Sequence, residues 1–247
     1  MLKTPALILK KQNLGETDRI LTIFSPILGK KRVIAKAIRR PLSKLAGHLD
    51  TMMLSQIMLT DEDELPRVSS AVLAEPFENI RNRLTLLNRA YAITKIIERV
   101  IVEDVAERPI FYLTTDCLRR LNDGEKWEAI WLHFLSRLAN SLGLAITDFR
   151  CCNCRRALAA ETFWVFDEHK FTCRSCVQTP NVLRLEPNSI KMIKILGQEN
   201  YEAVLRISIP EKIAGTNPKT CSFVYIKSAS LTDRNILPHE TGIDKNK

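Results

Sequence analysis

Two Cys-x-x-Cys pairs constrain the fold of this chain more than any other feature of its sequence. The pair Cys151 and Cys154 is followed, after 18 intervening residues, by the pair Cys173 and Cys176. Two residues between cysteines let a tight turn bring both sulfurs within about 2.3 Å of one ion, and two such turns supply a tetrahedron. The spacing therefore predicts one structural zinc ion bound by Cys151, Cys154, Cys173 and Cys176.

The residues around these pairs refine this prediction. Residues 162–172 are rich in aromatic and β-forming side chains, as in the hairpin of a zinc ribbon. Cys152 is the spare thiol, because only Cys151 has the two-residue gap to Cys154, and we expect His169 to be a turn residue. A redox dithiol and an iron–sulfur cluster are the alternatives, although ferredoxin-type clusters use other spacings. Four thiolates leave no open coordination position, which argues against a zinc hydrolase and against an enzyme.

Positive charge is concentrated near the N-terminus. The chain has 37 Lys and Arg against 28 Asp and Glu, a net charge of +9. Residues 1–50 hold eleven basic and three acidic residues, and residues 29–47 hold seven basic residues and no acid. Charge gathered in so short a segment indicates a surface for nucleic acid or another polyanion. The alternative is a solvated edge strand whose lysines prevent aggregation.

The first 75 residues have the pattern of a small β domain. Five apolar runs, separated by turn residues, predict strands at residues 6–11, 19–24, 31–38, 52–59 and 67–73. Five strands at this spacing predict an antiparallel β-barrel of the OB type, and SH3-like barrels fit nearly as well. The side chains expected to fill the barrel are Leu7, Leu9, Leu21, Ile23, Val33, Leu54 and Val72.

From Pro76 onward the apolar period changes to three and four residues, which is typical of amphipathic helices. This period predicts helices over about 76–105, 110–121 and 127–142, and a shorter one over 190–196. The fold class is therefore α+β. We expect a β domain at 1–75, a helical domain formed by 76–150 and 178–206, a zinc-ribbon insertion at 151–177, and a weakly patterned segment at 207–247.

Other searches of the sequence are negative. No apolar run approaches the roughly 20 residues that cross a bilayer, and the N-terminus has no apolar stretch long enough for a secretory signal. Seven cysteines without an export signal indicate reduced thiols, so we expect a cytoplasmic protein. The sequence also lacks a phosphate-binding glycine loop, a serine nucleophile elbow and a His-Glu-x-x-His helix.

Several motifs resemble those of a known family. Residues 15–19 (Gly-Glu-Thr-Asp-Arg) resemble the Gly-Glu-x-Asp-Arg signature of the bacterial recombination mediator RecO family. The pair Gly29-Lys30, the segment Ala-Lys-Ala-Ile-Arg-Arg-Pro at 35–41, and Gly-His-Leu at 47–49 are similar too. A helical domain interrupted by a four-cysteine zinc site is a further point of similarity. The resemblance covers roughly residues 1–200.

The resemblance implies a fold and a function. It implies an N-terminal OB-fold, a helical domain and an inserted zinc ribbon. It also implies DNA repair by the RecFOR pathway in the cytoplasm, at the nucleoid, with no membrane partner. The expected activities are binding of single-stranded and double-stranded DNA, annealing of complementary strands and, with RecR, loading of RecA onto strands coated by single-strand-binding protein. RecA is thus an indirect partner, and the acidic tail of single-strand-binding protein a direct one.

The residues suggest how such a protein would hold DNA. OB-folds usually stack bases on aromatic side chains, yet residues 1–75 contain only one aromatic residue, Phe24. We therefore hypothesise that the domain binds the phosphate backbone and leaves the bases free to pair. The expected DNA-binding residues are Arg19, Lys30, Lys31, Arg32, Lys36, Arg39, Arg40 and Lys44.

Two other classes of function have the same charge pattern. A zinc-ribbon protein that binds RNA or acts in transcription would also carry a basic surface. An adaptor could use this surface for the acidic tail of a partner protein, which overlaps with the implied contact to single-strand-binding protein. Competition between single-stranded DNA and RNA separates the RNA-binding class from the DNA-binding one, and weak DNA binding without salt dependence would favour the adaptor.

Overall fold

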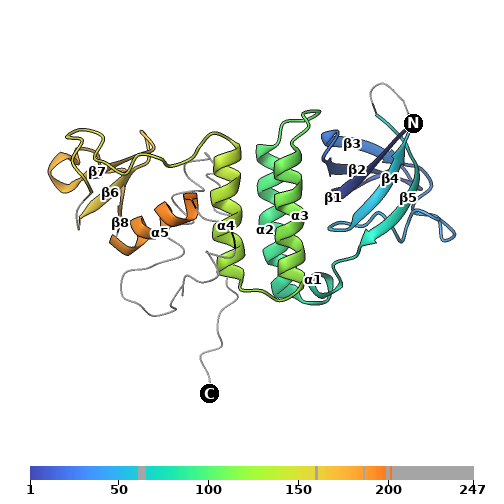
Figure 1. Ribbon diagram of the computed structural model, residues 1–247. Coiled ribbons are helices and arrows are strands. Elements are labelled where there is room, and N and C mark those ends of the chain that lie inside the picture. Colours follow the sequence, from blue (N-terminus) through green and yellow to red (C-terminus); the bar gives the residue numbers. More distant parts are fainter. Residues whose placement is uncertain (61–64, 159–160, 186, 199–200, 202–247) are drawn as a thin grey trace, which may run out of the picture. The chain divides into compact units, whose positions relative to one another are not determined.

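The computed structural model describes residues 1–60, 65–158, 161–185, 187–198 and 201, which form a mixed α+β fold (Figure 1). The described residues fall into two compact units, of which the first comprises Met1–Gly124 and the second begins at Glu125. The order of an antiparallel sheet followed by helices confirms the α+β prediction. The predicted domain boundaries stay predictions, and the segment 207–247 lies outside the described residues.

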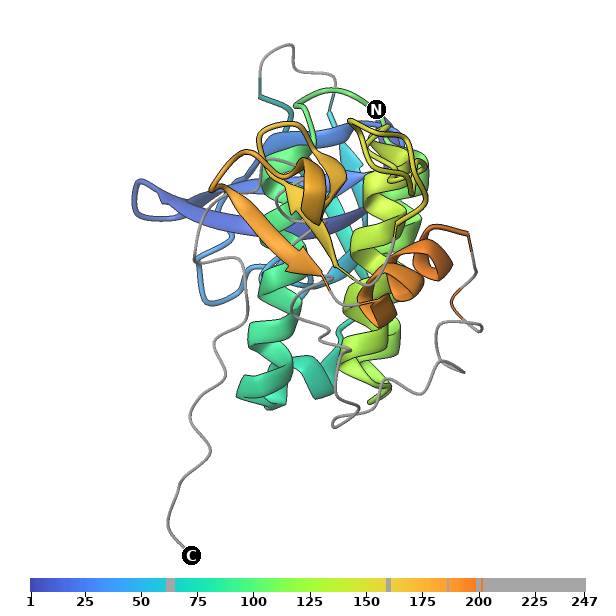
Figure 2. The ribbon, with the colours of Figure 1, turned by 90° about the vertical axis from the view of Figure 1, so that its left-hand side faces the viewer.

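The first unit begins with a five-stranded antiparallel sheet of order β3-β2-β1-β4-β5. Strand β1 lies in the centre and pairs with both β2 and β4. Its C-terminal half continues into the β1–β2 hairpin, which extends beyond the sheet (blue in Figure 2). The strands are β1 (Leu2–Leu14), β2 (Asp18–Ser25), β3 (Gly29–Ala35), β4 (Leu54–Leu59) and β5 (Val68–Glu75).

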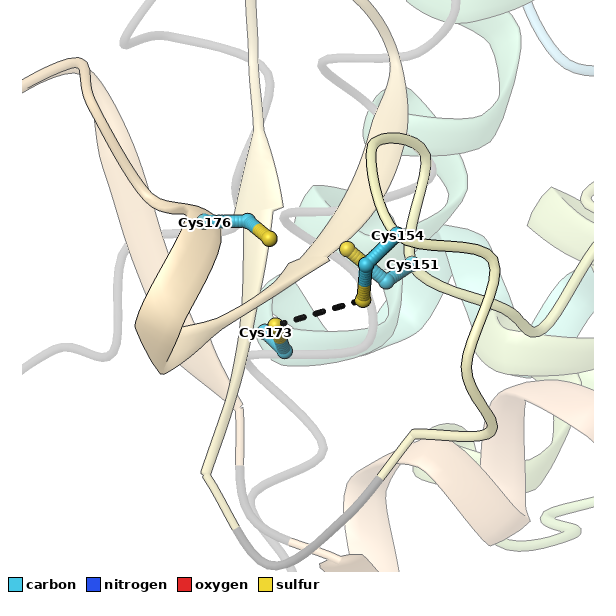
Figure 3. Close-up of side chains that lie close together, drawn as sticks. All are labelled: Cys151, Cys154, Cys173 and Cys176. Carbon is cyan, nitrogen blue, oxygen red and sulfur yellow. Dashed lines mark hydrogen bonds between the residues drawn. The ribbon is translucent and has the colours of Figure 1, made fainter.

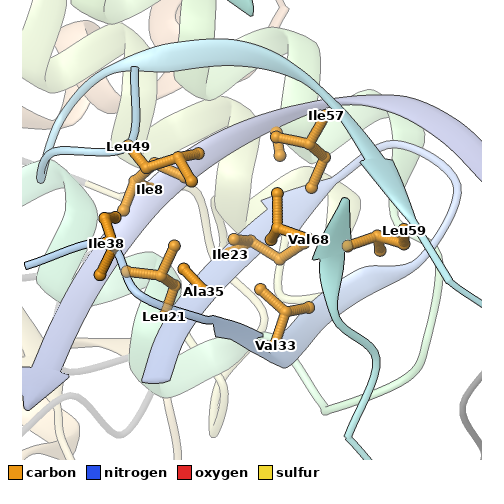
Figure 4. Close-up of a cluster of buried hydrophobic side chains, with 11 residues drawn as sticks. Ile8, Leu21, Ile23, Val33, Ala35, Ile38, Leu49, Ile57, Leu59 and Val68 are labelled. Atoms are coloured by element: carbon orange, nitrogen blue, oxygen red, sulfur yellow. The ribbon is translucent and has the colours of Figure 1, made fainter. Parts of the chain in front are cut away.

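The hydrophobic core of the sheet lies on one face (Figure 4). Alternate residues of the strands point to this face, because side chains of a strand alternate between its two sides. Ile38 and Leu49, from the loop after β3, complete the cluster and are each 1% exposed. Its members are Ala6, Ile8, Leu21, Ile23, Val33, Ala35, Ile38, Leu49, Ile57, Leu59 and Val68.

The opposite face of the sheet is covered by helices in the region of β1 and β2. Strand β1 contacts α2 (Leu84–Val100), and β2 contacts α3 (Arg108–Asn122). Phe24 of β2 is fully buried, and its ring lies edge-on to Phe111 of α3 with centroids 5.5 Å apart. The sheet is therefore buried on both faces here.

The predicted interior residues are only partly correct. Leu21, Ile23 and Val33 belong to the core cluster. The leucines Leu7, Leu9 and Leu54 are buried but lie outside that cluster. Val72 is 65% exposed, so its assignment to the core was wrong. The register of β1 shifts between Ile8 and Lys10, and no simple alternation in the sequence predicts such a bulge.

The sheet is not closed into a barrel, which corrects the predicted OB-type barrel. Closure requires a ladder between the edge strands β3 and β5, and between β3 and the residues just before β5 the described residues contain a single parallel bridge, Ile34 with Arg67. Its hydrogen bond runs from the N–H of Ile34 to the carbonyl of Pro66 at 2.9 Å. Since a single bridge is not a ladder, the edges of β3 and β5 are not joined into a closed barrel.

The helices begin and end near the predicted positions, with one break. The helix predicted over 76–105 is divided into α1 (Glu78–Asn82) and α2, because Arg83 between them is extended, with φ −126° and ψ 114°. Helix α3 follows in the first unit. The second unit contains α4 (Trp127–Ser141) and α5 (Pro187–Gln198). No helix among the described residues is both long and apolar enough to span a membrane.

The second unit also contains a three-stranded antiparallel sheet of order β7-β6-β8. Its strands are β6 (Thr162–Val165), β7 (Lys170–Cys173) and β8 (Val182–Leu185). Strands β6 and β7 form the hairpin predicted between the cysteine pairs. Trp164 and Phe171 pair across β6 and β7 and are almost fully buried.

A close backbone contact joins the five-stranded sheet to the segment between α2 and α3. Gly29 begins β3 with φ +67°, and a Cβ atom at this position would lie 1.9 Å from the carbonyl oxygen of Val105. Next to it, the N–H of Asp104 donates to the carbonyl of Lys30 at 3.0 Å. Only glycine satisfies both the positive φ and the absence of space for a side chain.

We expect Gly29→Ala to destabilise the protein by at least about 3 kcal/mol, because a left-handed conformation costs roughly 1–2 kcal/mol and the methyl group also displaces Val105. Gly15→Ala is the matched control, since Gly15 has φ +58° but no atom within 4 Å of the added Cβ. The control should lose only the stability that the left-handed conformation costs. Urea denaturation measures the free energy of unfolding of both variants. Equal losses in the two variants would show that the contact with Val105 is unimportant.

Candidate metal centre and nucleic-acid interface

The four predicted cysteines come from two similar turns. In the first turn, the N–H of Arg155 donates to the carbonyl of Cys151 at 3.0 Å. In the second, Cys173 ends β7 and the short 3-10 helix η1 (Arg174–Cys176) follows, with the N–H of Val177 donating to the carbonyl of Cys173 at 3.1 Å. Figure 3 shows the four cysteine side chains gathered between the turns.

The sulfur positions suit one metal ion. The Sγ atoms of Cys151, Cys154, Cys173 and Cys176 all lie within 4.8 Å of one another. The Sγ atoms of Cys154 and Cys173 are 3.8 Å apart. A tetrahedral ion with metal–sulfur bonds of about 2.3 Å separates its sulfurs by about 3.8 Å. The group could therefore hold one ion in tetrahedral coordination.

The surroundings favour a thiolate at Cys151. Burial acts to raise the pKa of this thiol, but the N–H groups of Cys154, Cys173 and Asn153 and the hydroxyl of Thr172 outweigh it and lower the pKa to about 5. The pKa of Cys176 is raised to about 12, first by its hydrogen bond to Cys173 and then by burial. Metals bind thiolates, so binding of an ion to this group releases protons.

Cys152 and His169 do not belong to this group of ligands. The Sγ atom of Cys152 lies 3.6 Å from the side-chain oxygen of Asn153. Burial, and then the charge of Glu168, raise the pKa of Cys152. His169 is exposed in the turn between β6 and β7, with φ 54°. Both residues are placed as the sequence predicts, the one as the spare thiol and the other in a turn.

Aromatic packing supports the first cysteine turn. The N–H of Cys152 donates to the carbonyl of Phe171 at 2.8 Å, which ties the turn to β7. The ring of Phe171 stacks on Phe149 at 5.6 Å and lies edge-on to Trp164 at 5.0 Å. These contacts help to place the first pair of cysteines opposite the second pair.

We expect Cys151→Ser to lose the metal ion and to lower the unfolding temperature of the second unit, since a structural metal contributes directly to folding. Cys152→Ser is the matched control, because it removes an adjacent thiol outside the group. Metal content by mass spectrometry and thermal unfolding by circular dichroism measure the effect. A full complement of metal in Cys151→Ser would disprove the ligand assignment.

The predicted DNA-binding residues fall into three sets. Lys30 and Lys31 are bound within the protein, at the junction described above. The Nζ atom of Lys30 donates to the carbonyl of Glu98 at 2.8 Å, and the Nζ atom of Lys31 pairs with a carboxylate oxygen of Asp104 at 2.7 Å. These two lysines stabilise the contact between sheet and helices, and are less available to an external anion.

The second set is exposed. Arg32 lies on β3, and Lys36, Arg40 and Lys44 lie on the segment after it, residues 36–44, which we call the basic loop. In the part of the chain that the structure describes, none of these four side chains forms an ion pair. A phosphate group could therefore contact them without displacing an acidic partner.

Arg19 and Arg39 have an intermediate position. Arg19 is half-buried on β2, and its Nε atom donates to the side chain of Asn13 at 3.3 Å. The guanidinium of Arg39 is exposed and donates to the carbonyl of Gly15 at 3.1 Å. Each of these bonds is made with a neutral acceptor, so both side chains keep their full positive charge.

Asp18 fixes the start of the basic loop. Its carboxylate accepts the N–H of Ala37 at 2.7 Å and the hydroxyl of Thr17 at 2.9 Å. Ala37 has a left-handed backbone with φ 53°, an unusual conformation for a residue other than glycine. The hydrogen bond from Ala37, followed by that from Thr17, lowers the pKa of Asp18. The Gly-Glu-x-Asp-Arg motif thus acts in part by shaping the basic loop.

Apolar contacts hold the basic loop from the other side. Ile38 inserts into the core of the sheet, where it is 1% exposed, and Leu45 packs against the same cluster. The loop is therefore anchored at both ends while Lys36, Arg40 and Lys44 face solvent. A fixed loop loses little conformational entropy when a ligand binds.

A polar groove lies on the first unit, and none of its lining residues belongs to the basic loop. It has a volume of about 330 Å³ and runs along the outer face of β1, β2 and β3 next to α2. Acidic and basic side chains both line it, so its charge is more balanced than that of the loop. The lining residues are Lys10, Gln12, Ile20, Thr22, Lys30, Arg32, Glu98 and Glu103.

Two features of the site depend on contacts that the sequence does not show. Phe24 is fully buried against Phe111 and cannot stack on a nucleotide base. This supports binding through phosphates. Glu98 and Asp104, which bind Lys30 and Lys31, are about 70 residues distant along the chain, and no local pattern predicts these partners.

We expect Asp18→Ala to speed hydrogen exchange at the Ala37 amide several-fold, because this N–H loses its acceptor. Glu16→Ala is the matched control, since it removes an acid from the same hairpin turn. The lowered pKa of Asp18 means that its bond persists at neutral pH and is lost only as the pH falls through that lowered pKa, below the ordinary value of 3.8. Unchanged exchange in Asp18→Ala would contradict this role.

Two family models match the chain. The model described as Recombination protein O N terminal matches residues 1–77, and Recombination protein O C terminal matches residues 81–216. A DNA repair protein RecO of Dehalococcoides mccartyi is 27% identical over 212 residues, which is 85% of this chain and 84% of the relative. The RecO protein of Caldicellulosiruptor bescii is 24% identical over 237 residues, 96% of each chain. The RecO protein of Acetivibrio thermocellus is 27% identical over 214 residues, which is 86% of this chain and 85% of the relative.

Proposed function

The chain belongs to the RecO family of DNA repair proteins, and from this premise we propose that it is a recombination mediator that binds single-stranded DNA. In this proposal it anneals complementary strands and, together with RecR, loads RecA onto strands coated by single-strand-binding protein. The observation that carries the proposal is the anchored basic loop, whose Lys36, Arg40 and Lys44 side chains face solvent.

The geometry of the first unit supports a phosphate-binding mode. Asp18 and Ile38 fix the basic loop, and Arg32 adds a further cation on the adjacent strand. Affinity for DNA then comes from release of counterions and depends steeply on salt. The single aromatic residue of this region, Phe24, is buried, so the bases are not held by stacking. Bases that the protein leaves unstacked are free to pair, as annealing requires.

We assign the five-stranded sheet to the OB type, in an open form. OB-folds are five-stranded and only partly closed, and they bind oligonucleotides. The bridge between Ile34 and Arg67 lies where β3 and β5 would close such a fold. The open edge does not weaken the proposal, because the residues that carry it lie on β3 and the loop after it.

The ion that we propose for the four cysteines is zinc. Four thiolates in tetrahedral geometry are the ligands of structural zinc sites. When bound, zinc supplies a fixed cross-link between the two turns. Because the four thiolates fill its coordination sphere, the ion has no position for water or substrate, and we propose a binding protein without enzymatic activity.

The remaining partners and the location follow from the same proposal. The acidic tail of single-strand-binding protein has the charge that the basic loop attracts, and RecR and RecA are proposed on family membership. A protein that acts on chromosomal DNA in bacteria works in the cytoplasm, at the nucleoid. RNA binding and an adaptor role for acidic peptides are the competing functions.

We expect the protein to bind a fluorescent single-stranded oligonucleotide with an affinity that falls by a log–log slope of about −0.7 for each phosphate neutralised. The variant Lys36→Ala/Arg40→Ala/Lys44→Ala should flatten this slope by about 2. A matched control, Arg83→Ala/Lys95→Ala/Arg108→Ala, removes three exposed charges from the same unit, outside the basic loop, and should keep the slope.

Three outcomes would contradict the proposal. Binding without salt dependence would exclude the phosphate mode. A stronger preference for RNA than for DNA of the same sequence would favour the RNA-binding class. Displacement of DNA only by an acidic peptide, with no annealing of complementary strands, would favour the adaptor.

A further inference from the structure

A second cluster of basic side chains surrounds the metal centre. Each cysteine turn carries arginines next to its ligands, and β8 adds another beside them. These side chains are exposed, with side-chain exposures of 58% to 74% for the four that form ion pairs. We call this set the ribbon arginines, and its members are Arg150, Arg155, Arg156, Arg174 and Arg184.

The two acidic residues that pair with these arginines neutralise only part of their charge. Asp148 pairs with both Arg150 and Arg155, at 3.2 and 3.0 Å. Glu161 likewise pairs with both Arg174 and Arg184, at 2.6 and 3.2 Å. One carboxylate balances one guanidinium, so each of these groups keeps a net positive charge. Among the described residues Arg156 has no ion-pair partner, which adds a further charge.

The cysteine turns fix the backbone that carries these arginines. Arg155 directly follows the ligand Cys154 in a left-handed conformation with φ 60°, and its N–H bonds to the carbonyl of Cys151. Arg174 lies in η1, between Cys173 and Cys176. The shared carboxylates then orient the guanidinium groups. The result is a preorganised array of donors, which lowers the entropy cost of binding a polyanion.

An aromatic side chain lies beside the array. Phe163 of β6 pairs with Arg184 of β8, and directly opposed residues of adjacent strands lie on the same face of a sheet. Phe163 is half-buried, unlike Phe24 of the first unit. An aromatic ring next to an arginine offers a base a stacking surface, while the guanidinium contacts the phosphate.

We propose that the ribbon arginines and Phe163 form a second binding surface for single-stranded nucleic acid, separate from the basic loop. This inference rests on the proposed function and extends it. The arginines contact phosphates, and Phe163 stacks on one base. An annealing protein must hold two strands at once, and a second surface allows one chain to do so. Arginine forks and an accessible ring favour a polynucleotide over an acidic peptide, which has no base to stack.

The test uses the full chain in which the basic loop is neutralised by Lys36→Ala/Arg40→Ala/Lys44→Ala. Residual binding to a single-stranded oligonucleotide then reports on the second surface. Adding Arg156→Ala/Arg174→Ala/Arg184→Ala should weaken this binding about tenfold or more and flatten the salt slope by about 2. The matched control Lys126→Ala/Lys191→Ala/Lys194→Ala removes three exposed lysines of the same unit. Adding it should change neither the residual affinity nor the salt slope.

Two further variants keep the test decisive if the triple arginine variant loses its metal. Glu161→Gln frees Arg174 and Arg184 from their shared acid and should strengthen binding several-fold. Phe163→Leu should weaken binding to the same extent at every salt concentration, because stacking does not release counterions. The triple arginine substitution is also made in a chain whose basic loop is unchanged. This variant should fail to bring together two labelled, non-complementary oligonucleotides in an energy-transfer assay.

The outcomes separate this inference from the proposed function. If the unmodified protein binds no DNA at any salt concentration, the proposed function itself fails. If it binds DNA but the triple arginine and triple lysine variants behave alike, and Glu161→Gln has no effect, only the second surface is refuted. Binding of a poly-glutamate peptide that depends on the ribbon arginines, without an effect on DNA, would also overturn it.

Discussion

The contact between the backbones of Gly29 and Val105 determines how the charged residues of the first unit are used. It brings the start of β3 against the end of α2 and the segment after it, where the carbonyl of Glu98 and the carboxylate of Asp104 bind Lys30 and Lys31. These two lysines thereby serve the stability of the junction. The positive charge that remains accessible begins at Arg32 and continues into the basic loop. One backbone contact thus decides which cations of a continuous basic stretch face solvent.

Acidic residues in both units organise basic side chains. Asp18 binds a backbone amide and sets the conformation of the basic loop, although it lies close to Lys36 and Arg40. Asp148 and Glu161 each hold two arginines near the metal centre. In each place a small number of carboxylates positions a larger number of cations. Such an arrangement keeps net charge at the surface and also limits the freedom of long side chains.

The features that could be predicted from the sequence are those that depend on short spacings. The cysteine turns follow from two-residue gaps, and α3 and α4 follow from the apolar period of three and four. The failures involve partners distant in the chain. Closure of the sheet depends on how β3 meets the chain before β5, and these two segments are joined by one bridge, Ile34 with Arg67. The exposure of Val72 likewise depends on which strand pairs with β5. Asp104 binds Lys31 because the fold brings the two residues together, and no pattern in the sequence links them.

The bond between Asp18 and Ala37 also constrains the two positions unequally during evolution. Asp18 acts through its side chain, so most replacements at this position remove the acceptor. Ala37 contributes only its backbone N–H, which every residue except proline possesses. Its left-handed backbone even favours glycine or asparagine over alanine. Position 37 is therefore open to drift while position 18 is restricted. In this contact a restricted aspartate can face a variable neighbour, and covariation between the two positions will not reveal that they touch.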